Sequence, residues 1–573
     1  MTAPAPTSPI KGPSSADLFL PKIITVLREG YHLRDLRADL VSGLTVAIVA
    51  LPLSMAIAIA SGVTPERGLF TAAIGGLLIS LLGGSRFQIG GPAAAFTVVV
   101  ASCVAREGLD GMFLATMMAG VFLVLIGALR LGSYIKFIPY PVTVGFISGI
   151  AVILFIGQIG DLLGLTLQSN PADILPKLEA IGAALTTFNI AAIAVSLGTV
   201  AIILALRKIA PQLPGILIAV VAGAAICALL KLPVDTIGTR FGGIPSTLPA
   251  PSLPAFSLAK AQAVLPDAVS FALLGAIESL LSAMVADGMT GRRHRSNVEL
   301  VAQGIANIGS ALFGGICATG TVARTATNVR SGARSPLSGV FHSIFIVLFM
   351  LVAAPLASYI PLAGLAGVLA VVSWNMIEKE AFATLVRTSW GDAVVVILTF
   401  GLTVFVGLTQ AIVVGFSLGT LLFLHRMAQS TDVEVHVPPV PEDVADEAGR
   451  PPYDATIATD PDVAIYRITG AFFFGAAATV GSLLDRIADR HKAFVVDFSA
   501  VPFIDSTAAN TLAGVARKAQ QSRVLLLISG ASAATAKTLA AHGISAPEVT
   551  FAPTVAAAFD AAHAAIALRR ATA

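Results

Sequence analysis

Long apolar segments follow one another along the chain as far as Leu424, separated by short polar stretches. A helix needs about 20 mostly apolar residues to cross the hydrocarbon core of a bilayer. Fourteen such segments are expected, near 40–60, 66–82, 92–105, 109–129, 141–159, 188–206, 214–230, 267–286, 298–313, 321–331, 338–359, 362–376, 391–408 and 410–425. The pattern predicts a polytopic α-helical membrane domain. An even number of spans puts both termini on the same side.

Positively charged residues are concentrated in every second loop between the expected spans, on the side of the N-terminus. Arg28, Arg34 and Arg37 precede the first span, and the other loops expected on the same side hold most of the remaining cations: Arg86, Arg130, Lys136, Arg207, Lys208, Arg292, Arg293, Arg295, Arg330, Arg334, Lys379 and Arg387. Lys and Arg are enriched in cytoplasmic loops of membrane proteins. We therefore expect a multi-pass protein of the cell (inner) membrane with cytoplasmic N- and C-termini.

Two of the expected spans, 92–105 and 321–331, are too short to cross a membrane alone. Each begins at a Gly or Pro after a short extended segment, and each is the third span of a set of seven. Interruptions at matching places in two halves are typical of inverted-repeat transporters. The sequence therefore predicts a 7+7 inverted repeat. The alternative is two kinked helices with no shared role.

The composition changes after Arg426. An acidic, proline-rich stretch precedes alternating strands and helices, which predict a small cytoplasmic α/β domain. Strands are expected over 463–469, 493–498 and 524–528, and helices over 476–490, 506–520, 532–541 and 554–570. The expected organisation is an N-terminal segment (1–38), a transmembrane domain (39–427), a linker (428–462) and the α/β domain (463–573).

Composition narrows the functional class. Of the 573 residues, 56% are hydrophobic and 12% charged, about half the usual share of charge. A net charge of +3 gives no basic surface for nucleic acid. Cys103, Cys227 and Cys317 lie far apart in apolar stretches, which suits neither a disulfide framework nor a metal site. No catalytic motif stands out, so we expect neither an enzyme nor a cofactor.

The two interrupted spans predict an anion site. The N-terminus of a helix presents unpaired N–H groups and a partial positive charge, and two such ends meeting in the membrane would attract an anion. The expected substrate-binding residues are Gly91, Pro92, Ala93, Ala94, Ala95, Phe96 and Thr97 in the first half, and Gly320, Thr321, Val322, Ala323 and Arg324 in the second. Close helix packing is the alternative role of the small residues.

Two ionisable residues lie at membrane depth, where charge is costly and usually functional. Arg324 would add fixed positive charge to the anion site; a structural pair is the alternative. Glu278 is expected to take up a proton, or to hold Na⁺ together with Ser282, one turn further along the helix. An ion pair between Glu278 and Arg324 is the other possibility.

These motifs resemble the sulfate permease (SulP) family of anion transporters over nearly the whole chain. The resemblance is carried by Pro52-Leu53-Ser54-Met55-Ala56 in the first span, by Gly90–Phe96, by Gly320–Ala326, and by Asp497–Thr507, which is similar to the STAS domain of that family. Leu53 and Ile57 stand where many members have Gln and Tyr.

The resemblance implies core and gate domains, a homodimer, and substrate bound between the third and tenth spans, with Ser54 and Arg324 at the site. It also implies a regulatory role for Asp505, Ser506 and Thr507. The stretch around Glu278 is similar to bacterial C4-dicarboxylate transporters of the family, whereas the bicarbonate transporters have Asp there. A dicarboxylate is therefore ranked first, sulfate second and bicarbonate third.

The expected function is secondary active transport of a small inorganic or organic anion, in symport with protons. A Na⁺-coupled bicarbonate transporter and an uncoupled anion channel or exchanger are the alternatives, and a sensor led by the STAS domain is a third. Glu278 favours coupled transport, because a pure anion pore gains nothing from a buried carboxylate. Protons are preferred to Na⁺ because Glu278 is one methylene longer than the Asp of the sodium-dependent relatives.

Overall fold

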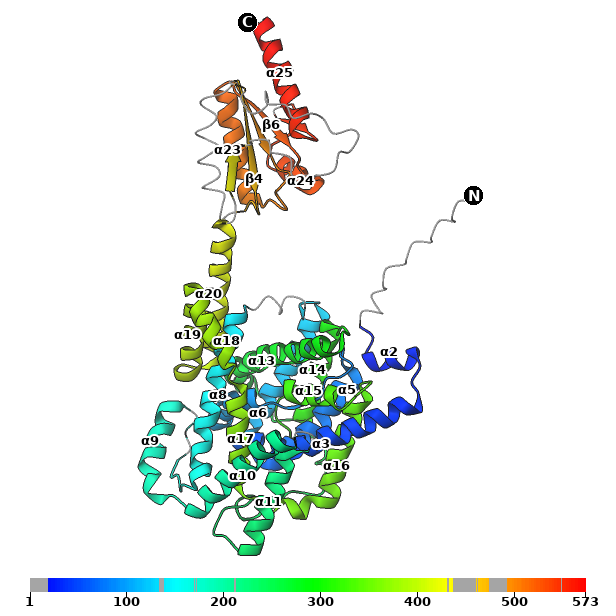
Figure 1. Cartoon of the computed structure of the whole chain (residues 1–573), viewed down its shortest axis with the longest axis vertical. Coiled ribbons are helices and arrows are strands. Elements are labelled where there is room, and N and C mark those ends of the chain that lie inside the picture. Colours follow the sequence, from blue (N-terminus) through cyan, green and yellow to red (C-terminus); the bar gives the residue numbers. More distant parts are fainter. Residues whose placement is uncertain are drawn as a thin grey trace. The chain divides into compact units, whose positions relative to one another are not determined.

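The computed structural model describes residues 19–132, 139–169, 171, 173–210, 213–429, 432–435, 460, 462–473, 492–547 and 549–572. The chain forms two compact units, Met1–Ser417 and Leu418–Ala573, drawn along one colour ramp in Figure 1. The first unit contains the expected spans up to 391–408, and the second contains the α/β domain. The expected helix over 476–490 and most of the expected linker lie outside the described residues.

Helices dominate the first unit, and their bounds follow the apolar segments closely. They are α2 (Lys22–Glu29), α3 (Leu33–Ala60), α4 (Pro65–Phe70), η1 (Thr71–Gly75), α5 (Gly76–Leu82), η2 (Ala94–Phe96), α6 (Thr97–Ala128), α8 (Tyr140–Leu163), α9 (Ile174–Ala184), η3 (Leu185–Thr187), α10 (Ile190–Ile209), α11 (Gly215–Leu230), α12 (Ile237–Phe241), α13 (Leu258–Thr290), α14 (Ser296–Leu312), α15 (Val322–Arg330), α16 (Leu337–Ala357), α17 (Leu362–Met376), α18 (Lys379–Thr388), α19 (Trp390–Phe405) and α20 (Leu408–Gln429), which continues into the second unit.

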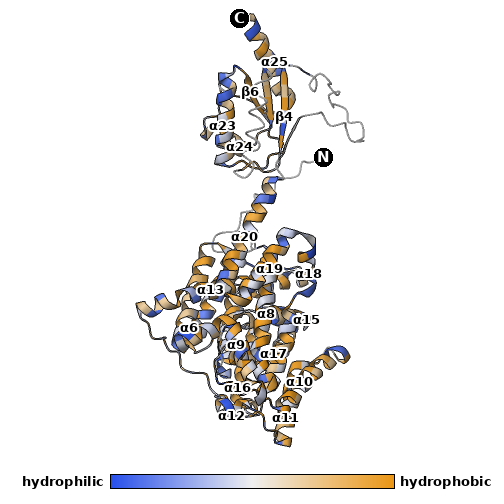
Figure 2. Ribbon diagram, turned by 90° about the vertical axis from the view of Figure 1, so that its left-hand side faces the viewer, coloured by the Kyte–Doolittle hydropathy of each residue, from blue (hydrophilic) through white to orange (hydrophobic). Residues whose placement is uncertain are grey.

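Nine helices of the described chain are long and apolar enough to cross a membrane, and α11 and α19 are shorter apolar helices. Figure 2 shows these helices coloured mainly as hydrophobic, as expected for helices that cross a lipid bilayer. The two spans expected over 92–105 and 109–129 are continuous in α6. Gly108 lies between them with φ +70° and ψ −175°, which is not helical, so α6 is two helical pieces joined at this residue.

The helices pack in two groups. In the first, α6 contacts α13 and α14, α3 contacts α16, and α15 contacts α13. In the second, α8 contacts α17 and α19, and α10 contacts α11 and α17. This division corresponds to the core and gate domains implied by the resemblance, and α3 contacts both α11 and α17 where the groups meet.

A short strand pair lies inside the first group. Strand β1 (Gly90–Pro92) pairs antiparallel with β2 (Ala318–Gly320), with Gly91 opposite Thr319. Asn307 of α14 donates to the carbonyl of Ala318 and accepts from its N–H, at 2.8 and 2.9 Å, which satisfies the free edge of β2. The pair joins the two short spans, which confirms that their interruptions share a structural role.

The second unit has a five-stranded sheet in the order β3-β4-β5-β6-β7. Its strands are β3 (Asp432–Val435), β4 (Val463–Thr469), β5 (Ala493–Asp497), β6 (Leu525–Ser529) and β7 (Thr550–Ala552), parallel except for the antiparallel pair β3–β4. Helices α23 (Ser506–Gln521) and α24 (Ala533–Ala541) contribute to one apolar core, and α25 (Val555–Thr572) to the other.

Strand β3 corrects one expectation. The segment 428–462 is predicted as a linker, yet residues 432–435 form the edge strand of the sheet, with Val433 opposite Ile468. The proline-rich composition that follows hides a strand too short to give its own alternation signal. What makes it a strand is the free edge of β4, which offers backbone hydrogen bonds.

Candidate anion site between two helix starts

A cavity of about 530 Å³ lies between the two helix groups of the first unit. Helices α3, α13 and α15 form one side, and α8, α11 and α17 the other. Most of its wall is apolar; the polar and charged lining residues are Glu278, Thr321, Arg324, Thr327, Asn375 and Glu378. A largely apolar cavity with a few convergent polar groups is the usual form of a small-molecule site.

Both interrupted spans begin at this cavity. Pro92, Ala93, Ala94 and Ala95 line it from one side, and Thr321, Val322 and Ala323 line it from the other. The first N–H groups of α15 and of the turn η2 have no intrahelical acceptor, so they remain available to a ligand. The strand pair β1–β2 holds the two starts together, so their partial positive charges act on the same space.

Arg324 adds a full positive charge to the partial charges of the two helix starts at this cavity. Its side chain is among the largest fully buried ones, and only Nη2 is bonded, to Ser54 Oγ at 3.1 Å and to the Pro92 carbonyl at 3.4 Å. Nε and Nη1 have no partner among the described residues, and no described carboxylate pairs with the guanidinium. Buried polar groups are normally bonded, so these two nitrogens are donors that a ligand in the cavity could use.

Glu278 faces the same cavity from α13. Its side chain is half-buried and, among the described residues, has neither a hydrogen bond nor an ion pair. Leu281 and Val285 follow it into the lining at spacings of three and seven residues, so one face of α13 borders the cavity. The suggested ion pair between Glu278 and Arg324 is not formed, and both charges are left for other partners.

Ser282, one turn beyond Glu278 on α13, is not part of the lining. Its hydroxyl donates to Thr325 Oγ1 at 2.9 Å, and Thr325 Oγ1 in turn accepts the N–H of Ile89 at 3.1 Å. The hydroxyl therefore links α13 to the start of α15 and to β1.

Other expected substrate residues hold the site in shape instead of lining it. A Cβ on Gly91 would fall on the Arg324 guanidinium, and a Cβ on Gly320 would fall on the Gln88 amide, so both positions need glycine for close packing. Phe96 packs edge-on against Phe271, with ring centroids 6.1 Å apart. The buried hydroxyl of Thr97 has no partner among the described residues.

Several lining residues have no signal of their own in the sequence. Val46, Val49, Leu53 and Ile57 line the cavity from α3. Their spacing of three to four residues marks one helix face, but such spacing is equally common in a packed core. Leu53 and Ile57 are the two positions at which the chain departs from the Gln and Tyr of many family members, so the departures fall on the cavity wall.

The expected regulatory residues lie in the second unit. Asp505 is the N-cap of α23, and its carboxylate accepts the N–H of Ala508 at 2.8 Å. Ser506 and Thr507 are exposed at the first turn of that helix.

Comparison with known proteins agrees with this architecture. Residues 36–399 match the model of the sulfate permease family, and residues 454–558 match that of the STAS domain. The chain is 40% identical, over 88% of its length and 93% of the relative's, to the putative sulfate transporter YvdB of Bacillus subtilis.

Two solved structures are similar to this fold. The transmembrane domain of a cyanobacterial bicarbonate transporter, BicA, matches 68% of this chain and 98% of its own, with 35% identity and a TM-score of 0.60. The murine anion transporter Slc26a9, in an inward-facing state, matches 98% of this chain and 96% of its own, with a TM-score of 0.83 at 18% identity. At that identity the second likeness shows the fold alone.

The chain belongs to the sulfate permease family and carries a C-terminal STAS domain. It is a multi-pass membrane transport protein and not an enzyme.

Proposed function

We propose that this protein is a secondary anion transporter that binds the anionic group of its substrate at Arg324, between the two helix starts. One observation carries the proposal: a buried guanidinium with two unpartnered nitrogens borders a cavity between the two helix groups. A fork of N–H donors suits the paired oxygens of a carboxylate, bicarbonate or sulfate. Movement of one helix group against the other would expose the cavity to each side in turn.

We propose that Glu278 couples this movement to protons. Protonation of Glu278 raises the net charge of the cavity by one, which strengthens its attraction for an anion. Loss of the proton on the other side of the membrane weakens that attraction and favours release. A sodium ion would need several oxygen ligands around Glu278, and Ser282, the partner expected from the sequence, is not among the residues that line the cavity with it.

The proposed substrate is a C4-dicarboxylate, with sulfate and bicarbonate as rivals. The apolar wall of the cavity supports it, because a dicarboxylate can place one carboxylate at Arg324 and its methylene groups against Leu53 and Ile57. The relatives named above are sulfate and bicarbonate transporters, which supports the rivals. Counterflow into proteoliposomes with succinate, sulfate and bicarbonate tests the ranking; exchange of sulfate or bicarbonate without succinate would reject it.

The driving force needs a separate test. Uptake should rise as the pH on the substrate side falls and should not need Na⁺. Glu278→Gln should lose pH-driven accumulation while still catalysing measurable counterflow. Glu378→Gln is a matched control, because Glu378 lines the same cavity but accepts a hydrogen bond from Tyr140 at 3.2 Å. Uptake that is strictly Na⁺-dependent and flat with pH would reject proton coupling.

Further parts of the proposal concern the setting of the site. We propose that the protein lies in the cell (inner) membrane with both termini cytoplasmic, and that it works as a homodimer. We also propose that Asp505, Ser506 and Thr507 form a regulatory surface, supported by the exposure of both hydroxyls at the start of α23. Labelling of single cysteines placed near Arg28 or Arg569, in sealed cells, tests the orientation.

A further inference from the structure

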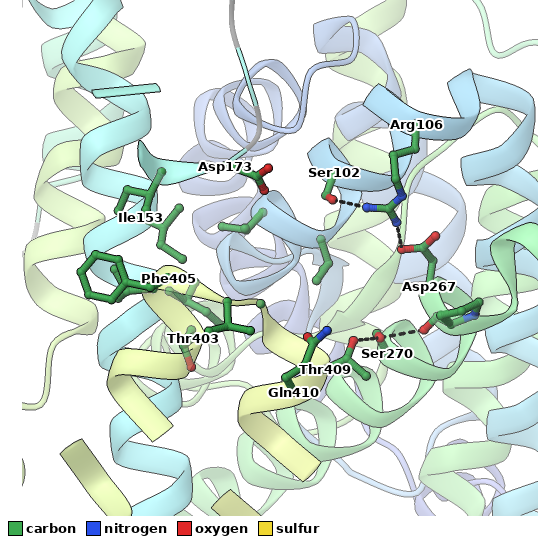
Figure 3. A pocket seen from close by; sticks show the side chains of 18 of the residues that line it. Ser102, Arg106, Ile153, Asp173, Asp267, Ser270, Thr403, Phe405, Thr409 and Gln410 are labelled. Atoms are coloured by element: carbon green, nitrogen blue, oxygen red, sulfur yellow. Dashed lines mark hydrogen bonds and ion pairs between the residues drawn. The ribbon is translucent and has the colours of Figure 1, made fainter. Parts of the chain in front are cut away.

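A second cavity, of about 450 Å³, borders the opposite part of α13 (Figure 3). It is lined by residues 263–270 of α13, by Ser102 and Arg106 of α6, and by the loop between α19 and α20. The Glu278 cavity borders residues 278–285, nearer the other end of the same helix. The positive-inside pattern puts the second cavity on the outer side of the membrane.

An acid–base pair lies on this outer cavity. Arg106 Nη2 contacts Asp267 Oδ1 at 2.6 Å, and Arg106 Nη1 donates to Ser102 Oγ at 2.5 Å, as drawn in Figure 3. The Arg106 side chain is 54% exposed, whereas Asp267 as a residue is 9% exposed. Asp267 Oδ2 is buried and has no partner among the described residues. The pair therefore joins an accessible cation to a buried, half-satisfied carboxylate.

Asp267 lies on the same face of α13 as Glu278. Eleven residues separate the two, which is three turns of α13 and a rise of about 16 Å. Eleven residues bring the chain back to the same face of a helix, so the two carboxylates lie in one line along α13. Each of them lines one of the two cavities.

We propose that Arg106 and Asp267 form an outer loading site at which the transported anion binds Arg106 and a proton binds Asp267. An arriving oxyanion competes with Asp267 for the accessible guanidinium. The carboxylate, freed from its counter-ion in a buried place, then takes a proton from the outer water. One anion and one proton thus enter together. This inference rests on the proposed proton coupling and adds the site at which the two are first paired.

The groups around the Arg106–Asp267 pair include no other cation that could bind the anion in place of Arg106 among the described lining residues. Of the other titratable groups, the Cys103 thiol of α6 lies against Asp267, Glu107 of α6 lies near Arg106, and Asp173 lines the cavity at the start of α9. The facing helix α20 contributes the uncharged Thr409 and Gln410, and Thr409 shares a hydrogen bond with Ser270 at 2.5 Å. Arg106 is the one cation among the lining residues described by the structure, so an anion in this cavity has it as its charged partner.

Full-length protein in proteoliposomes, with a pH-sensitive dye trapped inside, tests the proposal. Succinate, sulfate and bicarbonate are added outside in parallel, and proton and anion entry are recorded together. Asp267→Asn should reduce the protons that enter per anion at least fivefold. Arg106→Gln should raise the external half-saturation concentration about tenfold, as expected for a lost charged hydrogen bond. It should also lower the number of protons that enter per anion, because an arriving anion no longer frees Asp267 from a counter-ion.

Asp110→Asn is the matched control. Lys260 and Asp110 form an ion pair between the same two helices, at 3.8 Å, but neither lines the cavity. This variant should stay within twofold of the wild type in both measurements. If each of the two variants, Asp267→Asn and Arg106→Gln, lowers proton entry and anion entry by the same factor, the ion pair only stabilises the packing of α6 against α13, and the inference is wrong. A wild type that moves anions without protons would instead reject the proposed coupling itself.

Discussion

Each unit of the molecule buries a charge, and the two charges are treated in opposite ways. In the second unit, which contains the STAS domain, the Asp497 side chain is fully buried and well satisfied: it accepts from Arg467 Nε at 2.8 Å, from Ser499 Oγ at 2.8 Å and from Ser529 Oγ at 3.2 Å. In the membrane unit Arg324 is 2% exposed, yet two of its three guanidinium nitrogens lack any partner among the described residues.

The difference separates structure from function. A fold that buries a charge for stability must surround it with partners, because an unpaired buried charge is costly. The Asp497 cluster does this and ties the ends of β5 and β6 together. The unpaired charge of Arg324 is instead consistent with the proposed role, in which the substrate anion supplies the missing partners. The comparison predicts that changes at Asp497 affect stability and that changes at Arg324 affect transport.

The largest effect is expected at Arg324. Arg324→Ala should raise the half-saturation concentration for uptake about 10- to 100-fold, since hydrogen bonds to charged groups contribute roughly 1.5–3 kcal/mol. A dianion should lose more than a monoanion. Thermal unfolding in detergent should be unchanged or shifted upward, because the variant removes an unpartnered buried charge. Failure to insert, or a large loss of stability, would show that Arg324 is a structural residue after all.

The opposite pattern is expected at Asp497. Asp497→Ala should destabilise the second unit by about 2 kcal/mol, below the range for fully buried pairs because the Arg467 side chain is one-third exposed. Amide hydrogen exchange of β5 and β6 in the full-length protein measures this loss. Substrate affinity, measured in parallel, should change much less than in Arg324→Ala; an equal fall would remove the contrast between the two charges.

A change of pH sharpens the same contrast. Burial by itself would raise the pKa of Asp497, but hydrogen bonds from Arg467 and Ser499 outweigh it and hold the pKa below its ordinary value. The resulting stability is present above the unfolded-state pKa of about 3.9 and is lost as the pH falls through the folded-state pKa. Exchange rates in β5, corrected for intrinsic chemistry, should therefore show destabilisation on acidification from pH 6 to pH 3.5. The response should be smaller in Asp497→Asn.

The smallest effect is expected at Ser54, whose hydroxyl holds Arg324 Nη2. Ser54→Ala should raise the half-saturation concentration about two- to tenfold, less than Arg324→Ala, because Ser54 only positions Arg324 and Nη2 keeps its contact with the Pro92 carbonyl. Ser61→Ala is a fair control, since Ser61 is buried at the C-terminal end of α3 and its hydroxyl donates to the carbonyl of Ile57. A larger loss in the control than in Ser54→Ala would contradict the positioning role of Ser54.

Much of the fold follows from local patterns, which explains where prediction from sequence succeeds and where it stops. Apolar runs place α3, α13 and α16 within a few residues of their ends, apart from extensions at helix starts that carry charge. The extensions of α3 to Leu33 and α13 to Leu258 lie beyond the apolar segments, where hydropathy gives no signal. The edge strand β3 is missed because it is defined by the neighbour with which it pairs.

The sequence by itself determines that this is a membrane transport protein with two matched, interrupted spans. It also identifies Arg324 and Glu278 as the ionisable residues at membrane depth that are candidates for function. These conclusions need only hydropathy, glycine and proline spacing, and the cost of charge in lipid. Only the tertiary structure decides which partners those charges have. The chain brings Ser54, Pro92 and Arg324 together across more than 200 residues, sends Ser282 to Thr325 instead of Glu278, and leaves both charges facing one cavity. Contacts of that kind depend on how helices pack against each other, which no local pattern in a single sequence encodes.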